Sequence, residues 1–327
     1  MKYRRLGRTG LEVSEIVFGA GWVGGVLIHH DADIGREALR RARAAGINWI
    51  DTAPSYGDGV SEHALGTLLP ELEWDPYIST KFHVDPASEL PVNEQIERSV
   101  AASLARLGRT SVDLLQLHNP VGADSGSRHL AVDRVLEPGG VADALDDLKH
   151  RGVTRHVGFT ANGDAASLER MVASGRFDTA QVYYNMLNPS AGRVVPVGWS
   201  AMDFGDVLAR CAEHDVGVFV IRVMAAGVLA TATRTGREIP MYESADMASE
   251  EIRARAVWAA IEDEPGSRAQ AAIRFVLGDP RVGGVLVGPH LPEHVSEAVA
   301  AVDMAPFAPD TEAALVRLYA NDFGRLS

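Results

Sequence analysis

Cysteine is nearly absent from this chain, since Cys211 stands alone among 327 residues. A single thiol cannot build the intrachain disulfide framework of a small secreted domain, so the composition is typical of a reducing compartment. Basic residues are also in deficit: 31 Lys and Arg face 44 Asp and Glu and leave a formal net charge of −13. Nucleic acids and anionic membranes attract positively charged proteins, so we expect neither as a main partner.

Long apolar runs are missing as well. The best candidate, residues 16–28, contains four glycines and is shorter than the ~18 residues that a membrane-spanning helix needs. The pair Arg4-Arg5 resembles a twin-arginine signal, but Glu12 and Glu15 interrupt the apolar region that such a signal requires. We therefore expect an ordinary N-terminus and a cytoplasmic protein.

What the chain does contain is a regular alternation of short apolar runs with longer segments of helical periodicity. Strands are predicted at residues 15–20, 47–51, 77–81, 112–118, 156–160, 179–183, 216–222 and 283–287. Strands that alternate with helices pair in parallel through right-handed crossovers. The simplest closure is an α/β fold of the (β/α)8 TIM-barrel type, in which residues 1–327 form a single domain. An open doubly wound sheet is the alternative.

Glycines and long loops mark the connections of this predicted barrel. Five helices are expected to end at a glycine, because a helix C-terminus favours a residue with positive φ: Gly46, Gly108, Gly152, Gly175 and Gly217. Long loops follow the fourth, sixth and seventh strands, at residues 119–137, 186–200 and 224–248. Loops after the strands of a barrel lie on the C-terminal face, where active sites are built.

Two motifs suggest functions that their context does not support. Residues 19–24 match G-x-G-x-x-G, with Asp51 as the acid of a dinucleotide fold, but helical periodicity starts only near Asp33 and Asp51 follows 27 residues after Gly24. Residues 290–294 match H-x-x-E-H, a zinc motif that needs both histidines on one helical face. Pro292 at its centre excludes a continuous helix there, so no metal site is predicted.

Four polar residues fall at or just after the ends of three consecutive predicted strands: Asp51, Tyr56, Lys81 and His118. Neighbouring strands of a barrel bring such residues together on the catalytic face. A tyrosine can donate a proton to a developing alkoxide, and a lysine cation beside it favours the phenolate. Asp51 would pair with Lys81, and His118 would orient a carbonyl oxygen. This set suits hydride transfer from a cofactor.

At these residues the sequence resembles the aldo-keto reductases. The resemblance rests on segments 51–57 (DTAPSYG), 79–81 (STK), 113–118 (DLLQLH), 158–160 (GFT) and 181–185 (QVYYN), together with 6–14 (LGRTGLEVS) near the start. It implies a (β/α)8 barrel that binds an extended nicotinamide cofactor without a dinucleotide-binding fold. It also implies that Tyr56 is the proton donor and that Asp51, Lys81 and His118 complete a catalytic tetrad.

The resemblance further implies a set of residues around the cofactor. Thr160 and Gln181 would hold the nicotinamide carboxamide, and the segment 287–294 would bind the adenosine phosphates at a helix N-terminus. The cofactor-binding residues expected on this basis are Gly21, Trp22, Asp51, Thr160, Gln181, Arg222, Val287, Gly288, His290 and His294. NADP(H) is somewhat favoured because Arg222 and His290 could bind its extra phosphate, and NAD(H) remains possible.

We therefore predict an NAD(P)-dependent enzyme that interconverts a small aldehyde or ketone, including a sugar, and the alcohol. Two other hypotheses are open. One is a cofactor-binding regulatory protein, which resembles the channel-associated branch of the same family. The other is a non-redox barrel enzyme that uses Lys81 to form a Schiff base.

Overall fold

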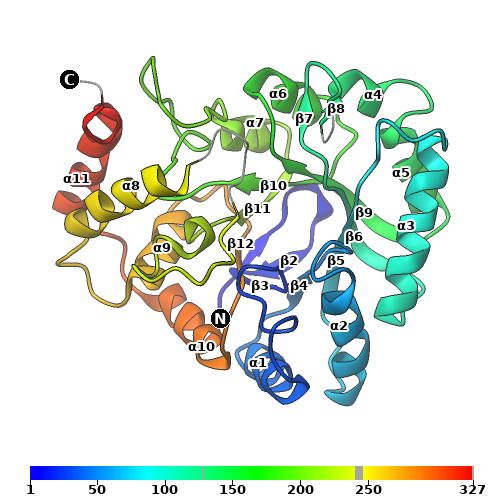
Figure 1. The fold of residues 1–327 in the computed structure, drawn as a ribbon, viewed down its shortest axis with the longest axis horizontal. Coiled ribbons are helices and arrows are strands. Elements are labelled where there is room, and N and C mark those ends of the chain that lie inside the picture. Colours follow the sequence, from blue (N-terminus) through cyan, green and yellow to red (C-terminus); the bar gives the residue numbers. More distant parts are fainter. Residues whose placement is uncertain (127–128, 240–245, 326–327) are drawn as a thin grey trace.

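The computed structural model describes residues 1–126, 129–239 and 246–325. Eight parallel strands close into a barrel in the order β10-β11-β12-β3-β4-β5-β6-β9 (Figure 1). Their bounds are β3 Ile16–Gly19, β4 Trp49–Asp51, β5 Tyr77–Phe82, β6 Val112–Leu117, β9 Thr154–Ala161, β10 Thr179–Tyr183, β11 Gly217–Ile221 and β12 Gly284–Val287. Each strand expected from the sequence is present. The (β/α)8 barrel is therefore confirmed, and the open doubly wound sheet is wrong.

Helices surround the barrel and cover the outer face of its strands (Figure 1). Their bounds are α1 Ala32–Ala44, α2 Val60–Glu71, α3 Val92–Leu107, α4 Val132–Leu136, α5 Val141–His150, α6 Ala165–Ala173, α7 Val207–Glu213, α8 Met247–Ala260, α9 Arg268–Leu277, α10 Pro292–Ala300 and α11 Pro309–Ala320. Short 3-10 turns are η1 Gly7–Thr9, η2 Ala225–Gly227, η3 Ala301–Asp303 and η4 Asp322–Gly324. None of the helices within the described ranges has the length and apolarity to cross a bilayer.

Helix α3 shows how the sequence pattern produces this layer. Its buried residues recur three or four positions apart and so share one face: Ile96, Val100, Ser103 and Leu107. Gly108 then adopts a left-handed conformation, with φ of 62°, and ends the helix. The strands behave differently, because helices cover one face and the barrel interior covers the other. All six residues of β6 are buried, as expected for a parallel strand.

A hairpin of β1 Tyr3–Arg5 and β2 Glu12–Ser14 packs against the start of the barrel strands. Leu6 belongs to a buried cluster with Trp49, Leu114 and Phe219, whose side chains come from three different strands. These residues fill the interior at the N-terminal end of the barrel. The opposite, C-terminal end is therefore the one left for a site.

The prediction that Gly217 ends a helix is wrong. Helix α7 ends at Glu213, and Asp215 takes the left-handed conformation with φ of 51°. Gly217 begins β11, where a Cβ atom would lie 2.8 Å from the backbone oxygen of Leu6, so the close approach of the hairpin requires glycine there. The other predicted glycines each have positive φ after a helix: Gly46, Gly108, Gly152 and Gly175.

The three long loops leave the C-terminal ends of β6, β10 and β11, as predicted. The first contains the short parallel pair β7 Val121–Gly122 and β8 Leu130–Ala131, followed by α4. The second has no regular element between β10 and α7. The third contains η2. Part of it, residues 240–245, lies outside the described residues.

Candidate active site

Three neighbouring strands bring the four predicted polar residues together. Asp51 ends β4 and is the register partner of Ser79 in β5. Lys81 lies two residues further along β5, and His118 directly follows β6. Tyr56 lies in the loop between β4 and α2. All four therefore meet at the C-terminal end of the barrel.

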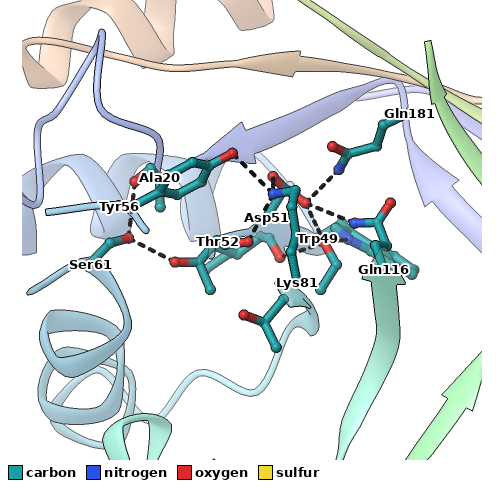
Figure 2. Close-up of polar contacts among 12 residues, drawn as sticks. Ala20, Trp49, Asp51, Thr52, Tyr56, Ser61, Lys81, Gln116 and Gln181 are labelled. Carbon is teal, nitrogen blue, oxygen red and sulfur yellow. Dashed lines mark hydrogen bonds and ion pairs between the residues drawn. The ribbon is translucent and has the colours of Figure 1, made fainter. Parts of the chain in front are cut away.

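Lys81 is the centre of this arrangement. Its ammonium group donates hydrogen bonds to Asp51 Oδ2 at 2.6 Å, to the Thr52 carbonyl at 2.9 Å and to Tyr56 Oη at 3.0 Å (Figure 2). The side chain is only 1% exposed, and that of Asp51 only 2%. Burial lowers the pKa of Lys81, but the Asp51 carboxylate and the Tyr56 oxygen outweigh it, so the pKa is raised overall. Lys81 is thus a fixed cation.

Besides Lys81, three side chains from β5, β6 and β10 donate hydrogen bonds to Asp51. Its Oδ1 accepts from Ser79 Oγ at 2.8 Å, from Gln116 Nε2 at 3.3 Å and from Gln181 Nε2 at 2.6 Å (Figure 2). Ser79 and Gln116 were missed by the sequence analysis. Strand alternation could have found them. Ser79 precedes Lys81 by two positions and Gln116 precedes His118 by two, so each points to the same side as the residue already identified.

The loop that carries Tyr56 is tied down locally. Tyr56 N donates to the Ala53 carbonyl at 3.1 Å, and Ser61 N donates to the Tyr56 carbonyl at 3.2 Å. Ser61 Oγ also donates to the carbonyl of Ala20 at 2.9 Å and lies 2.8 Å from Thr52 Oγ1 (Figure 2). The hydroxyl of Tyr56 is therefore presented to Lys81 from a loop anchored on both sides.

His118 completes the group from β6. Its backbone N–H donates to the Phe82 carbonyl at 2.9 Å, and its ring meets the Tyr56 ring edge to face, with centroids 6.1 Å apart. Burial, the Lys81 cation and the neighbouring His83 hold the pKa of His118 well below its ordinary value. The imidazole is therefore neutral near pH 7. Its buried Nδ1 has no hydrogen-bond partner among the described residues.

The residues expected around a nicotinamide ring also converge here. Gln181 in β10 is the register partner of Thr160 in β9. Three buried polar atoms at these strand ends lack a partner within the described part of the chain: Thr160 Oγ1, Gln116 Oε1 and His118 Nδ1. A Cβ atom at Gly21 would lie 3.6 Å from the Tyr56 ring, and Trp22 beside it is 38% exposed. A buried hydroxyl without a partner, such as that of Thr160 next to Gln181, fits the carboxamide of a nicotinamide cofactor.

The Gly-rich segment 19–24 has a structural explanation. A Cβ atom at Gly24 would lie 2.2 Å from the backbone oxygen of Gly288, so only glycine permits this contact. Val26 N then donates to the Pro289 carbonyl at 3.2 Å. The segment packs on the end of β12 and no helix opens within it. The dinucleotide-fold interpretation is therefore wrong, as the sequence context indicated.

The histidines of residues 290–294 are placed by the start of α10. Pro292 is its first residue, so His290 precedes the helix, as the sequence predicted. His294 Nδ1 accepts from the backbone N–H groups of His290 at 3.2 Å and Leu291 at 3.4 Å, and so caps the helix. Within the described ranges, no cluster of three His, Cys, Asp or Glu side chains is arranged to hold a metal ion.

His290 lies among other polar groups at the same end of the barrel. Its Nδ1 is 3.1 Å from the Gly24 carbonyl, 3.0 Å from His30 Nε2 and 3.3 Å from Arg237 Nη2. Partial burial lowers the pKa of His290; the Gly24 carbonyl opposes this shift, while Arg237, His30 and His294 add to it. Arg237 was missed by the sequence analysis, because an arginine in a long polar loop carries no positional signal.

Arg222 is the other predicted phosphate ligand. It directly follows β11 with a left-handed φ of 58°, and its carbonyl accepts from Asn185 Nδ2 at 2.9 Å. Its guanidinium donates to the Ile239 carbonyl at 2.5 Å, within the loop that also carries Arg237. Arg222 therefore contacts the same loop that brings Arg237 beside His290.

Comparisons with known proteins concern the family and the fold. Residues 15–320 match the aldo/keto reductase family. D-threo-aldose 1-dehydrogenase from a Pseudomonas species is 30% identical over 317 residues, covering 88% of this chain and 89% of the relative. L-galactose dehydrogenase from Arabidopsis thaliana is 29% identical over 310 residues, covering 92% and 88%. The fold is similar to that of an aldo-keto reductase from Bacillus halodurans in its holo form, with a TM-score of 0.72, 22% identity and coverage of 98% and 96%.

The family model spans nearly the whole chain, and the fold neighbour has the same overall architecture. This chain belongs to the aldo/keto reductase family.

Proposed function

We propose that this protein is a nicotinamide-dependent oxidoreductase that interconverts an aldehyde or ketone and the corresponding alcohol. The observation that carries the proposal is the buried chain of hydrogen bonds from Asp51 through Lys81 to the Tyr56 hydroxyl. A cation fixed against a phenol is suited to controlling the charge on a substrate oxygen. A lysine with only a structural role would not have to contact a tyrosine hydroxyl at the C-terminal end of the barrel.

The proposed roles follow from the positions of these side chains. Tyr56 donates the proton to the substrate oxygen during reduction and accepts it during oxidation. Lys81 stabilises the phenolate that remains, and Asp51 keeps the ammonium group in place. Neutral His118 donates a hydrogen bond to the same oxygen and so orients the carbonyl. The bound nicotinamide supplies or accepts the hydride.

Residues of this chain that would hold the cofactor lie on both sides of Tyr56. Thr160 and Gln181 have the donors and acceptors that a carboxamide needs, and Gly21, followed by Trp22, lies beside the Tyr56 ring. The candidates for phosphate contacts are Val287, Gly288 and His290 before α10, together with Arg237 beside His290 and Arg222 after β11. Arg237 beside His290 supports use of NADP(H), and NAD(H) uses the same site without the extra phosphate.

The substrate class we propose is an aldose or a similar hydroxylated carbonyl compound. Two of the curated relatives that are matched over most of this chain are named D-threo-aldose 1-dehydrogenase and L-galactose dehydrogenase. At about 30% identity, barrel loops differ more than barrel strands, so the particular sugar does not follow from the names.

The geometry weighs against the Schiff-base hypothesis. A Schiff base requires a neutral amine, whereas Lys81 donates three hydrogen bonds and its pKa is raised. The regulatory-protein hypothesis would require binding without turnover. The complete set of Asp51, Tyr56, Lys81 and His118 favours an enzyme instead.

The test is a panel of carbonyl compounds and sugars followed at the NAD(P)H absorbance band, with both cofactors and in both directions. We expect cofactor-dependent turnover of at least one hydroxylated aldehyde or aldose, which is lost in the Tyr56→Phe variant. Tight cofactor binding without turnover of any compound would favour the regulatory protein. Substrate trapping on Lys81 by cyanoborohydride would favour the Schiff-base enzyme.

A further inference from the structure

A buried carboxylate, Glu62, lies behind the proposed active site and has no role in the chemistry described so far. It is the third residue of α2, and its side chain is 0% exposed. Its Oε1 accepts a hydrogen bond from Thr80 Oγ1 at 2.6 Å, and its Oε2 accepts one from Arg106 Nε at 2.7 Å. Glu62 therefore joins three elements, namely α2, β5 and the last turn of α3.

Thr80 directly precedes Lys81 in β5. Successive residues of a strand point to opposite sides, so Lys81 faces the barrel interior while Thr80 faces the helices. A hydrogen bond to a carboxylate is stronger than one to a neutral acceptor. The contact with Glu62 therefore fixes the outer side of the strand whose inner side carries the ammonium group.

The loop that carries Tyr56 reaches α2 through three consecutive residues with left-handed backbone. Residues 57–59 have φ of 63°, 53° and 87°. This conformation is strained for Asp58, and strained backbone persists only where its surroundings hold it. A Cβ atom at Gly59 would lie 2.6 Å from Arg106 Cδ. The arginine that binds the buried carboxylate therefore also packs against this loop.

Glu62 thus connects the loop of the proposed proton donor to the strand of the cation. Tyr56 Oη accepts from Lys81 Nζ at 3.0 Å, and the ammonium group lies 4.7 Å from the centre of the Tyr56 ring. The attraction between a cation and a developing phenolate weakens with distance. A displacement of α2 relative to β5 would lengthen this contact even with every catalytic side chain present.

We propose that Glu62 is a positioning residue for proton transfer, which together with Thr80 and Arg106 holds the Tyr56 hydroxyl at hydrogen-bond distance from Lys81. This inference rests on the proposed function. A buried ion pair is costly to desolvate and is a weak source of stability. Its contribution here is to select one arrangement of α2 against β5.

The test removes one hydroxyl group. Thr80→Val keeps the shape of the side chain but leaves Glu62 without this donor, whereas Thr80→Ser retains the donor. Thr154→Val is the matched control: Thr154 is also buried and its Oγ1 donates to the His156 carbonyl at 2.8 Å, but it begins β9 at the opposite end of the barrel. Reduction of glyceraldehyde, or of a faster substrate from the panel above, by NADPH or NADH is followed between about pH 6 and pH 10. The unfolding temperature and cofactor Kd of each variant are also measured.

We expect Thr80→Val to lower kcat about tenfold, with KM and cofactor Kd changed less than about twofold. Reduction uses the protonated phenol, and a phenol held less closely by Lys81 ionises at higher pH, so the pH at which kcat falls to half should rise by about half a unit. Lys81 and His118 are titratable groups that face Tyr56, and both are retained in this variant. Thr80→Ser and Thr154→Val should each resemble wild type in kcat and in pH profile.

A folded Thr80→Val protein with the kcat and pH profile of wild type overturns the role of Glu62 alone, whatever its unfolding temperature. Equal losses in Thr80→Val and Thr154→Val overturn it as well. If Thr80→Val does not fold, Arg106→Gln replaces it, because the Arg106 side chain is 31% exposed, and wild-type values in that variant overturn the proposal. A wild-type protein that reduces no carbonyl compound of the panel overturns the proposed function, and this inference with it.

Discussion

Gln181 and Asp51 form a hydrogen bond of 2.6 Å across the interior of the barrel. Their strands, β10 and β4, are separated by three strands on either side of the closed order, so they lie opposite one another. The amide of Gln181 therefore reaches from the expected nicotinamide side of the site to the carboxylate that holds Lys81. We infer that cofactor contacts and proton transfer share this residue.

The two amides that donate to Asp51 should differ in their effect on cofactor binding. Gln181 is the register partner of Thr160, whereas Gln116 pairs with Lys81 and Gly158. We expect Gln181→Met to weaken cofactor binding about tenfold, because the carboxamide loses a hydrogen bond and a polar partner is left unsatisfied. The matched variant Gln116→Met should change cofactor Kd less than about twofold. Equal effects on Kd, measured by fluorescence quenching, would contradict this assignment.

The single variant Lys81→Met should destabilise the fold more than the double variant that combines it with Asp51→Asn. The pair is buried, so Lys81→Met leaves an uncompensated carboxylate in the barrel at a cost of about 3–5 kcal/mol. Asp51→Asn keeps an oxygen that can accept from Ser79. In a double-mutant cycle by urea unfolding, we expect the double variant to be more stable than the sum of the single losses indicates. Additive losses would show that the ion pair is not coupled in the folded protein.

The depressed pKa of His118 makes the folded protein less stable in acid. The unfolded histidine binds a proton below its reference pKa of ~6.5, whereas the folded one stays neutral, so the unfolding free energy falls as pH decreases through that value. The stabilising contribution is fully present above this range. We expect the unfolding free energy of His118→Asn to fall less steeply than that of wild type between about pH 7 and pH 5. Parallel curves for the two proteins would exclude a buried neutral His118.

Discrimination between NADP and NAD should depend more on Arg237 than on His290. Arginine keeps its charge at all relevant pH values, whereas the pKa of His290 is lowered by burial and by neighbouring cations. We expect Arg237→Gln to weaken NADP binding about tenfold and to leave NAD binding nearly unchanged. His290→Ala should have a smaller effect above about pH 7, with NADP binding strengthening only below the reference histidine pKa of ~6.5. An unchanged NADP-to-NAD ratio in Arg237→Gln would direct attention to Arg222.

Much of this architecture could be predicted because parallel strands have a strong local signal. Continuous apolar runs located all eight barrel strands, and the segments 51–57, 79–81 and 113–118 identified the family. The polar network around Asp51 was only half predicted: Lys81 was named, but Ser79 and Gln116 were not, although strand alternation places them on the same face. That residues 1–327 form one domain stays a prediction.

Other features depend on contacts that no local pattern reveals. Gly217 is glycine because Leu6, more than two hundred positions earlier, packs against it. Arg237 approaches His290 only because a long loop crosses the end of the barrel. The ring of His83 contacts the ring of His118, which follows the neighbouring strand β6. These contacts join residues that lie apart in the sequence, and they form because the barrel closes. They can be identified only after the strands and loops have been placed.

The most direct test of the central claim is transfer of label from cofactor to substrate. Wild-type protein and Tyr56→Phe are incubated with an aldose or hydroxyaldehyde and NADPH deuterated at the transferable position, and the alcohol is analysed by mass spectrometry. We predict one deuterium on the former carbonyl carbon with wild type, and a rate lower by roughly 10²–10⁴-fold in Tyr56→Phe with nearly unchanged cofactor Kd. Alcohol without deuterium, or a Tyr56→Phe rate within about threefold of wild type when chemistry limits turnover, would contradict hydride transfer assisted by Tyr56.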